Sequence, residues 1–217
     1  MSSVIVCAGG PVEEMIDLTK FTENHTLFIG ADKGTLHLLD AGIVPVEAVG
    51  DFDSVSSEEY EKIRSKVKKI DAYRSEKNET DTELAVERAL TYVPKEVVLT
   101  GVTGGRLDHM LSALHLLYRM QKKNPDVSFK ICNAHNEFII FLPGAHKITY
   151  HKELQYISFF AFQNTVSALT LRGFKYETDR EKLEIGMTKF TSNELLKKEG
   201  HILFEEGICL MVRSSDA

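Results

Sequence analysis

Two carboxylates one residue apart form the clearest chemical signal in this sequence. Asp51 and Asp53 follow the apolar run Val46–Val49, which predicts a strand. Because residues i and i+2 of a strand point to the same side, the two side chains can share a metal ion or its waters. Magnesium prefers hard oxygen ligands and is often held by one or two carboxylates plus substrate phosphates. Taken alone, the motif is explained slightly better by a turn or a helix cap formed by Asp53 or Ser54.

A third acidic residue follows another predicted strand. The apolar run Thr26–Ile29 leads into Gly30-Ala31-Asp32. Ligands of open α/β sheets sit beyond the carboxyl ends of the strands, where Asp32 would share an edge with Asp51. The simpler explanation is that Asp32 caps a helix beginning near Gly34. The alternative is a place in a phosphate or metal site.

A helix start carries the next candidates. Thr80 and Glu83 have the spacing of a capping box, so Thr80 is the expected N-cap. Asp81 in the first turn is favoured by the positive end of the helix dipole. This structural role is sufficient by itself. In the functional alternative, Asp81 faces a metal or phosphates, and Lys77 pairs with phosphate oxygens.

A glycine loop separates a predicted strand, Glu96–Leu99, from a predicted helix, Leu107–Met120. The loop contains Gly101, Gly104 and Gly105, so its backbone N–H groups can approach a phosphate closely. It is neither a P-loop nor a GxGxxG motif. A plain tight turn explains three glycines equally well.

Three polar residues follow this loop at the helix start. Arg106 could clamp a phosphate with two N–H donors, and Asp108 could orient Arg106 or meet the metal. His109 could act as a general base, although a packing or capping histidine is more common. The run Gly104-Gly105-Arg106-Leu107-Asp108-His109 is a moderate signal for phosphate binding.

A polar segment near the end of the chain has a local explanation. Thr191-Ser192-Asn193-Glu194 predicts a helix N-cap at Ser192 or Asn193, with helical signal over Asn193–Lys198. The residues themselves indicate no ligand there.

Composition narrows the class of protein. The chain has 217 residues, 43% hydrophobic and 27% charged, as expected for a soluble globular protein. The net charge of -6 argues against nucleic acid as the main partner, because phosphate backbones need clustered Lys and Arg. No apolar run is long enough to span a membrane, and the N-terminus does not resemble a signal peptide. The three cysteines are widely spaced, which favours reduced thiols and a cytoplasmic protein over a zinc site.

The order of predicted elements indicates two domains. Up to about residue 125 strands alternate with helices, which predicts a Rossmann-like α/β domain with a mostly parallel sheet. Beyond it, short strands punctuated by turn residues predict an all-β sandwich. We therefore expect an α/β domain over 1–142, which carries the candidate magnesium and phosphate ligands, and a β-sandwich over 143–217.

The motifs taken together resemble the thiamine pyrophosphokinase family. The resemblance covers nearly the whole chain, in order and spacing. It is carried by Gly50-Asp51-Phe52-Asp53-Ser54, by Thr80-Asp81 with Glu83, and by Gly104-Gly105-Arg106-Leu107-Asp108-His109. Gly30-Ala31-Asp32, Arg172-Gly173-Phe174-Lys175-Tyr176 and Ser192-Asn193 also fit the family pattern.

The resemblance implies a magnesium-dependent transfer of diphosphate from ATP to the hydroxyl of thiamine, giving thiamine diphosphate and AMP. It implies a homodimer with active sites at the subunit interface, and a second domain that binds thiamine. Ser192 and Asn193 would bond the aminopyrimidine. The expected catalytic residues are Asp51, Asp53, Asp81, Arg106 and Asp108, of which Asp51, Asp53 and Asp81 would hold the metal. The expected ATP-binding residues are Asp32, Lys77, Thr80, Gly104, Gly105, Arg106 and His109.

Two departures from the family pattern are visible. Asn78 stands where an acidic residue is common, and the chain has no tryptophan to pack against thiamine. Phe190, Phe204 or a tyrosine could stack instead. The alternatives to the expected activity are a pyrophosphokinase for another primary alcohol, such as a hydroxymethylpterin, and a non-catalytic sensor of nucleotide or thiamine diphosphate. A dinucleotide-dependent oxidoreductase is disfavoured by the missing GxGxxG.

Overall fold

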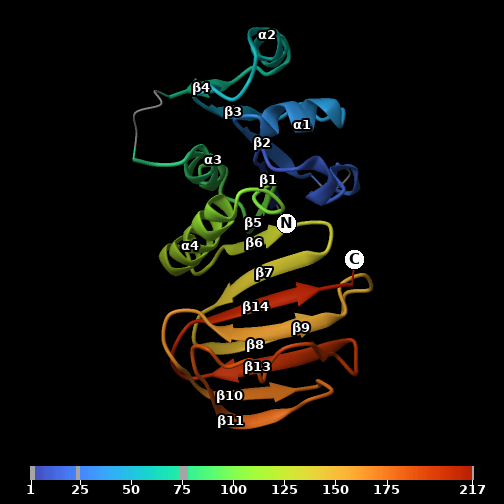
Figure 1. Ribbon diagram of the computed structural model, residues 1–217, viewed down its shortest axis with the longest axis vertical. Coiled ribbons are helices and arrows are strands. Elements are labelled where there is room, and N and C mark those ends of the chain that lie inside the picture. Colours follow the sequence, from blue (N-terminus) through green and yellow to red (C-terminus); the bar gives the residue numbers. More distant parts are fainter. Residues whose placement is uncertain (1–2, 23–24, 74–77, 217) are drawn as a thin grey trace. The chain divides into compact units, whose positions relative to one another are not determined.

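The computed structural model describes residues 3–22, 25–73 and 78–216. The chain forms two compact units, Met1–Ala134 and His135–Ala217 (Figure 1). This division falls before the expected boundary at 142, because the strand Asn136–Phe141 pairs along its length with the strand Cys209–Ser214 of the second unit.

The first unit is built on a parallel sheet. Its strands lie in the order β6-β5-β1-β2-β3-β4, and every pairing between them is parallel. Most of these strands are apolar and buried along their length, as expected where helices cover both faces of a sheet. The strands are β1 (Ser3–Cys7), β2 (Leu27–Ala31), β3 (Glu47–Gly50), β4 (Ile70–Ala72), β5 (Glu96–Thr100) and β6 (Ser128–Cys132).

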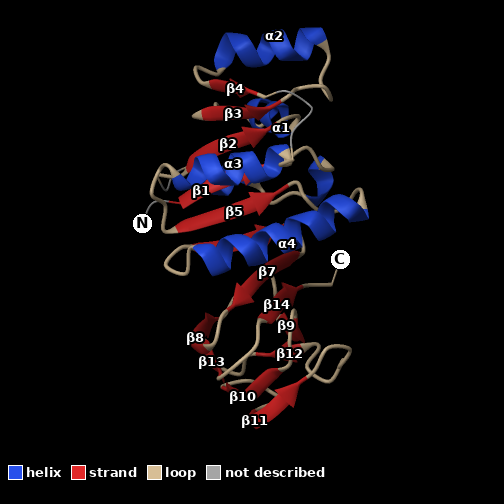
Figure 2. Ribbon diagram, turned by 90° about the vertical axis from the view of Figure 1, so that its left-hand side faces the viewer, coloured by secondary structure: helices blue, strands red, loops and turns tan. Residues whose placement is uncertain are grey.

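Four helices and two short 3-10 segments connect these strands. Of the helices, α1 packs on β1 and β2, α3 on β1, β2 and β3, and α4 on β6. Figure 2 shows α3 and α4 in front of the sheet, running roughly along the strands. The expected N-cap at Thr80 is confirmed, because its hydroxyl accepts the N–H of Glu83 three residues on. The cap expected at Asp32 is wrong, because α1 has Lys33 as its N-cap and no side-chain cap. The segments are η1 (Val12–Glu14), η2 (Leu18–Phe21), α1 (Gly34–Asp40), α2 (Ser57–Lys66), α3 (Asp81–Leu90) and α4 (Leu107–Lys123).

The second unit consists of antiparallel strands in two sets, β12-β9-β14-β7 and β11-β10-β13-β8. One apolar cluster, which includes Phe159, Leu171 and Phe204, draws side chains from both sets. A parallel sheet followed by an antiparallel β unit agrees with the expected fold class at this level. The strands are β7 (Asn136–Phe141), β8 (Gly144–Thr149), β9 (Tyr156–Ala161), β10 (Val166–Arg172), β11 (Thr178–Leu183), β12 (Asn193–Glu194), β13 (Glu199–Phe204) and β14 (Cys209–Ser214).

The predicted helix over Asn193–Lys198 is wrong. Asn193 and Glu194 form β12, which pairs with β9. The backbone N–H of Lys175 also donates to the carbonyl of Glu194 at 2.8 Å. Pairing with two segments distant in sequence therefore overrides the local signal for a helix cap. Sequence analysis also missed β4 and β11, whose short or polar sequences lack an apolar run.

Among the described residues, no helix is both long and apolar enough to cross a bilayer.

Candidate active site

A cavity of about 540 Å³ opens in the first unit. It lies where the parallel strands end, the usual ligand position in an open α/β sheet. The loops that follow β1, β2, β3 and β5 line it, together with the first turns of α3 and α4. Segments far apart in sequence thus converge on one hollow.

Three of the predicted acidic residues meet at this cavity, namely Asp32, Asp51 and Asp81. Burial raises the pKa of Asp32, and the charges of Asp81 and Asp51 raise it further, whereas a hydrogen bond from the Ser54 hydroxyl lowers it. One carboxylate oxygen of Asp32, Oδ1, is buried without a hydrogen-bond partner among the described residues. Such an oxygen is chemically suited to a cation or a ligand donor.

Asp53 does not lie beside Asp51 at the cavity as predicted. The strand β3 ends at Gly50, and Phe52 adopts a left-handed conformation with φ of 58° and is buried. The same-side argument for strand residues therefore does not apply to Asp51 and Asp53. The exposed Asp53 does not line the cavity, and its backbone N–H donates to Asp51 Oδ1 at 3.2 Å. Its role as a metal ligand stays a prediction.

The start of α3 brings Thr80 and Asp81 to the cavity wall. The Thr80 hydroxyl is occupied as the N-cap, accepting the N–H of Glu83 at 3.2 Å. Asp81 is in the first turn, where the helix dipole favours its negative charge. Lys77 lies outside the described residues.

The glycine loop after β5 places a guanidinium at the cavity. Arg106 donates to Asp108 through Nε at 3.1 Å and through NH2 at 2.6 Å, which makes a bidentate pair. The hydrogen bond from Arg106 lowers the pKa of Asp108 to about 2, so Asp108 stays ionised at neutral pH. Gly105, Arg106 and His109 line the cavity, whereas Gly104 and Asp108 do not.

Several lining residues were not found from the sequence. Among them are Gly9, Gly10, Lys33 and Glu79. The glycine pair directly after the apolar run of β1 was a usable signal, because Gly10 approaches another lining glycine. Its N–H donates to the carbonyl of Gly101 at 2.8 Å.

Ser192 and Asn193 lie in the second unit. Ser192 is exposed, and its N–H donates to Ser158 Oγ at 3.0 Å. Asn193 is buried, and its amide bonds the backbone of Tyr176 twice, accepting from N at 3.0 Å and donating to O at 2.8 Å. The side-chain oxygen also accepts the N–H of Glu194 at 2.9 Å. Asn193 therefore ties two chain segments together.

The aromatic alternatives differ in exposure. Phe204 is 1% exposed and Phe190 6% exposed, whereas the tyrosines Tyr176 and Tyr150 of the same unit are 61% and 55% exposed. Only a ring with exposed surface can stack on a ligand without rearrangement. Exposure therefore favours a tyrosine over either phenylalanine.

Metal binding by protein side chains alone finds no support in the described part of the chain. No group of three or more His, Cys, Asp or Glu residues there is arranged to hold a metal ion. Magnesium, however, is usually held by one or two carboxylates together with waters and substrate phosphates. The hard oxygens of Asp32, Asp51 and Asp81 fit such a partial site.

Comparison with known proteins identifies the family. Residues 18–129 match the family model described as thiamin pyrophosphokinase, catalytic domain, and residues 145–209 match thiamin pyrophosphokinase, vitamin B1 binding domain. A protein of Bacillus subtilis (strain 168) named thiamine pyrophosphokinase is 41% identical over 216 residues, covering 100% of both chains.

Solved structures give the same result. The crystal structure of thiamine pyrophosphokinase from Bacillus subtilis has a TM-score of 0.92 and 40% identity, covering 100% of both chains. That of thiamin pyrophosphokinase from Geobacillus thermodenitrificans has a TM-score of 0.90 and 36% identity, covering 100% of this chain and 99% of the other. The chain belongs to the thiamin pyrophosphokinase family.

Proposed function

We propose that this protein transfers a diphosphate from ATP to the hydroxyl of thiamine, giving thiamine diphosphate and AMP. The observation that carries the proposal is the full-length identity of 41% to a thiamine pyrophosphokinase. The cavity supports it, because carboxylates and a guanidinium from separate loops meet there. Diphosphate transfer needs positioning and charge stabilisation more than covalent chemistry.

The acidic residues are assigned to the metal and the nucleotide. Asp51, Asp53 and Asp81 would hold magnesium, which when bound neutralises charge on the triphosphate. Asp32 would complete the polar wall around the nucleotide. Its unpartnered, buried Oδ1 supports this role.

The remaining ATP contacts come from the loops on either side. Thr80 and Lys77 would contact the nucleotide before α3, and Gly104, Gly105 and His109 would do so around the glycine loop. Backbone N–H groups in a glycine loop suit this task, because no side chain blocks a phosphate.

Arg106 would stabilise the charge that develops on the phosphoryl oxygens. Its pairing with Asp108 supports a positioning role for that carboxylate, which keeps the guanidinium at the cavity. A carboxyl with a pKa of about 2 is a poor proton acceptor at neutral pH, so Asp108 is disfavoured as the group that takes the proton of the thiamine hydroxyl.

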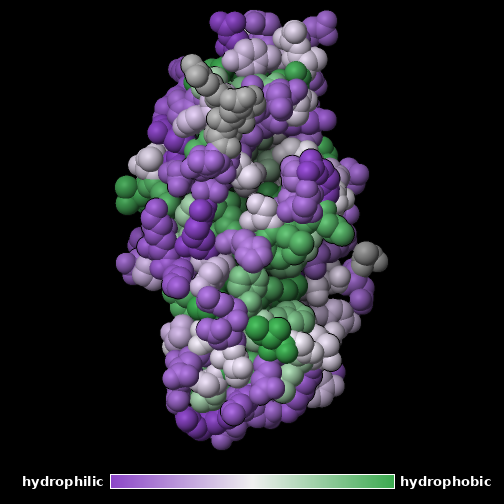
Figure 3. Space-filling model, turned by 60° about the vertical axis from the view of Figure 1, so that its left-hand side comes forward, coloured by the Kyte–Doolittle hydropathy of each residue, from purple (hydrophilic) through white to green (hydrophobic). Residues whose placement is uncertain are grey.

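Thiamine binding is assigned to the second unit, as a β-sandwich, and nucleotide binding to the first, as a Rossmann-like α/β domain. Ser192 and Asn193 would contact the aminopyrimidine. We also propose a homodimer whose subunits complete each other's active sites. Leu107 and Leu111, one turn apart on α4, support this, because they are 73% and 56% exposed in the single chain. Hydrophobic side chains also gather among hydrophilic ones on the face shown in Figure 3.

A cytoplasmic setting with small-molecule substrates, and no nucleic-acid or membrane partner, completes the proposal. Cys7, Cys132 and Cys209 form no disulfide bond, which supports a reducing environment.

The test is product identity. Purified protein with ATP, magnesium and thiamine is expected to release AMP in step with thiamine diphosphate. Stoichiometric ADP would contradict diphosphate transfer. AMP release with a hydroxymethylpterin but not with thiamine would support the other pyrophosphokinase. Ligand binding by calorimetry without AMP release would support a sensor.

A further inference from the structure

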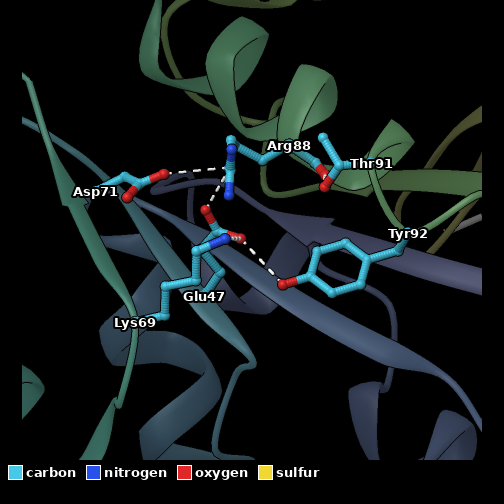
Figure 4. A network of polar contacts seen from close by, with 6 residues as sticks. All are labelled: Glu47, Lys69, Asp71, Arg88, Thr91 and Tyr92. Atoms are coloured by element: carbon cyan, nitrogen blue, oxygen red, sulfur yellow. Dashed lines mark hydrogen bonds and ion pairs between the residues drawn. The ribbon is translucent and has the colours of Figure 1, made fainter.

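A buried carboxylate lies in the sheet of the first unit, outside the cavity. Glu47, the first residue of β3, has a fully buried side chain. Its Oε1 accepts a hydrogen bond from Arg88 Nε at 2.5 Å. Its Oε2 accepts from Lys69 Nζ at 2.8 Å and from the Tyr92 hydroxyl at 3.1 Å (Figure 4). Arg88 Nε also lies 3.2 Å from Asp71 Oδ2, and we call these five residues the Glu47 cluster.

The Glu47 cluster is charged. Burial opposes ionisation of Glu47, but hydrogen bonds from Arg88 and Lys69 prevail and hold its pKa below the ordinary value. Buried ion pairs add little to stability compared with well-packed apolar groups, because desolvation offsets the attraction between the charges. The next residues of β3, Ala48 and Val49, are apolar and fully buried. Bulk stability alone is therefore a weak explanation for a carboxylate at this position.

One rigid element leads from Glu47 to the cavity. Successive strand residues point to opposite faces, so Glu47 and Val49 share a face while Ala48 packs into the α1 and α2 cluster on the other. The strand β3 then delivers Asp51 directly after Gly50. The backbone of β3 therefore connects Glu47 to Asp51 over a short distance along the chain.

The second rigid element is α3. Arg88 in its last turn lies about two helical turns after Asp81, so the two residues lie on nearly the same stripe of the helix. The residues that α3 buries are small, namely Ala85, Val86 and Ala89. Polar contacts also hold this helix: Arg88 in its last turn bonds Glu47 of β3, and Glu83 in its first turn pairs with Arg119 of α4.

We propose that Glu47 is a positioning residue of the active site: through Arg88 it sets the place of α3 on β3, and thereby the separation of Asp51 and Asp81 at the cavity. The inference rests on the proposed function only in taking the cavity as the site that binds magnesium and the nucleotide. It predicts that loss of the Glu47 charge weakens binding of a magnesium–nucleotide complex before it abolishes the fold.

The experiment measures binding directly. The variant Glu47→Gln keeps the side-chain volume and removes the charge. Calorimetric titration with magnesium and α,β-methylene ATP, whose scissile bond cannot be cleaved, should show affinity lower by about tenfold, the lower end of the loss when residues supporting a metal site are removed. The magnesium concentration for half-maximal AMP release should rise by a similar factor, with a smaller change in kcat.

Controls separate positioning from stability. Ile202→Val or Ile202→Ala, whichever matches the Tm of Glu47→Gln, removes core packing from the second unit and should leave the calorimetric affinity unchanged. Lys62→Ala breaks an exposed ion pair with Asp40 and should also change nothing. The double variant E47Q/R88M should bind no more weakly than R88M, because both changes act through one contact.

The outcomes are decisive. Equal affinity in Glu47→Gln and its Tm-matched control would overturn the proposal, as would additive losses in the double variant. If Glu47→Gln does not fold, the calorimetric titration is repeated with Arg88→Lys, which keeps the positive charge but loses the guanidinium group. Unchanged affinity in Arg88→Lys would overturn the proposal. Failure of the parent protein to release AMP would refute the proposed function and leave the calorimetric test intact.

Discussion

The contact between two glycine loops at the cavity can be tested by adding one methyl group. Gly10, after β1, donates its N–H to the carbonyl of Gly101, after β5. A Cβ at position 10 would lie 2.5 Å from that same oxygen and 3.2 Å from the carbonyl oxygen of Thr103. Gly10→Ala should therefore force the two loops apart.

The size of the effect follows from these distances. Ordinary contact begins at 3.4 Å, so the loops would have to separate by about 0.9 Å. Both atoms belong to backbone, which cannot rotate away as a flexible side chain would. Overpacking of this kind costs about 1–3 kcal/mol. The entropy gained by replacing glycine is about 0.4–1 kcal/mol, and it does not offset the clash.

Thermal denaturation is the assay, with the KM for ATP as the second readout. For a chain of this length each kcal/mol lowers the Tm by roughly 2–4 °C. Gly105→Ala is the matched control, because a Cβ there would meet Pro11 no closer than 3.5 Å. We expect Gly10→Ala to lower the Tm and raise the KM, and Gly105→Ala to leave the Tm unchanged. A parental Tm and KM in Gly10→Ala would refute the steric reasoning.

Three further predictions concern named side chains. Asp51→Ala should reduce turnover by roughly 10²–10³ with an unchanged Tm, and full turnover at saturating magnesium would contradict its assignment. The pKa of Asp108 is depressed, so its ion pair with Arg106 contributes to stability above the ordinary value of 3.8 and is lost as the pH falls through about 2. Above pH ~5, Asp108→Asn should therefore show the same acidic limb of the pH–rate profile as the parent protein. Disappearance of that limb would make Asp108 the proton acceptor. Asn193→Ala removes three hydrogen bonds to backbone and should destabilise the protein by about 1–3 kcal/mol in urea denaturation. Ser192→Ala should change only the KM for thiamine. Equal stability of the two variants would contradict the structural role of the Asn193 hydrogen bonds.

The parallel sheet and the position of the cavity could be predicted from the sequence. Several apolar runs end in glycine or aspartate and are followed by a helix signal. This local pattern is enough to predict a strand followed by a helix. The carboxyl ends of parallel strands share one edge, so Asp32 and Asp51 had to lie near each other. The structure places both at the same cavity.

What could not be predicted depends on contacts between distant segments. The polar segment at Asn193 gives a cap signal locally, but the amide is used by Tyr176. Glu47 stands in an apolar run, and nothing near it in the sequence reveals that Lys69, Arg88 and Tyr92 will surround its carboxylate. Secondary-structure propensity depends on a residue and its neighbours along the chain. The roles of Asn193 and Glu47 instead depend on residues distant in the sequence.

The positions of Asp51 and Asp53 depend on Gly50, the residue directly before Asp51. A Cβ at position 50 would lie 3.2 Å from the Cα of Asp32, closer than most real contacts, so the β2 and β3 loops can approach this closely only with glycine there. Asp32 itself has a left-handed φ of 50°, and Phe52 one of 58°. Strained backbone of this kind persists where the surrounding structure enforces it, often at functional sites. The carboxylate that accompanies Asp51 at the cavity is therefore Asp32, brought there by a glycine and two strained residues, rather than Asp53 two positions along the chain.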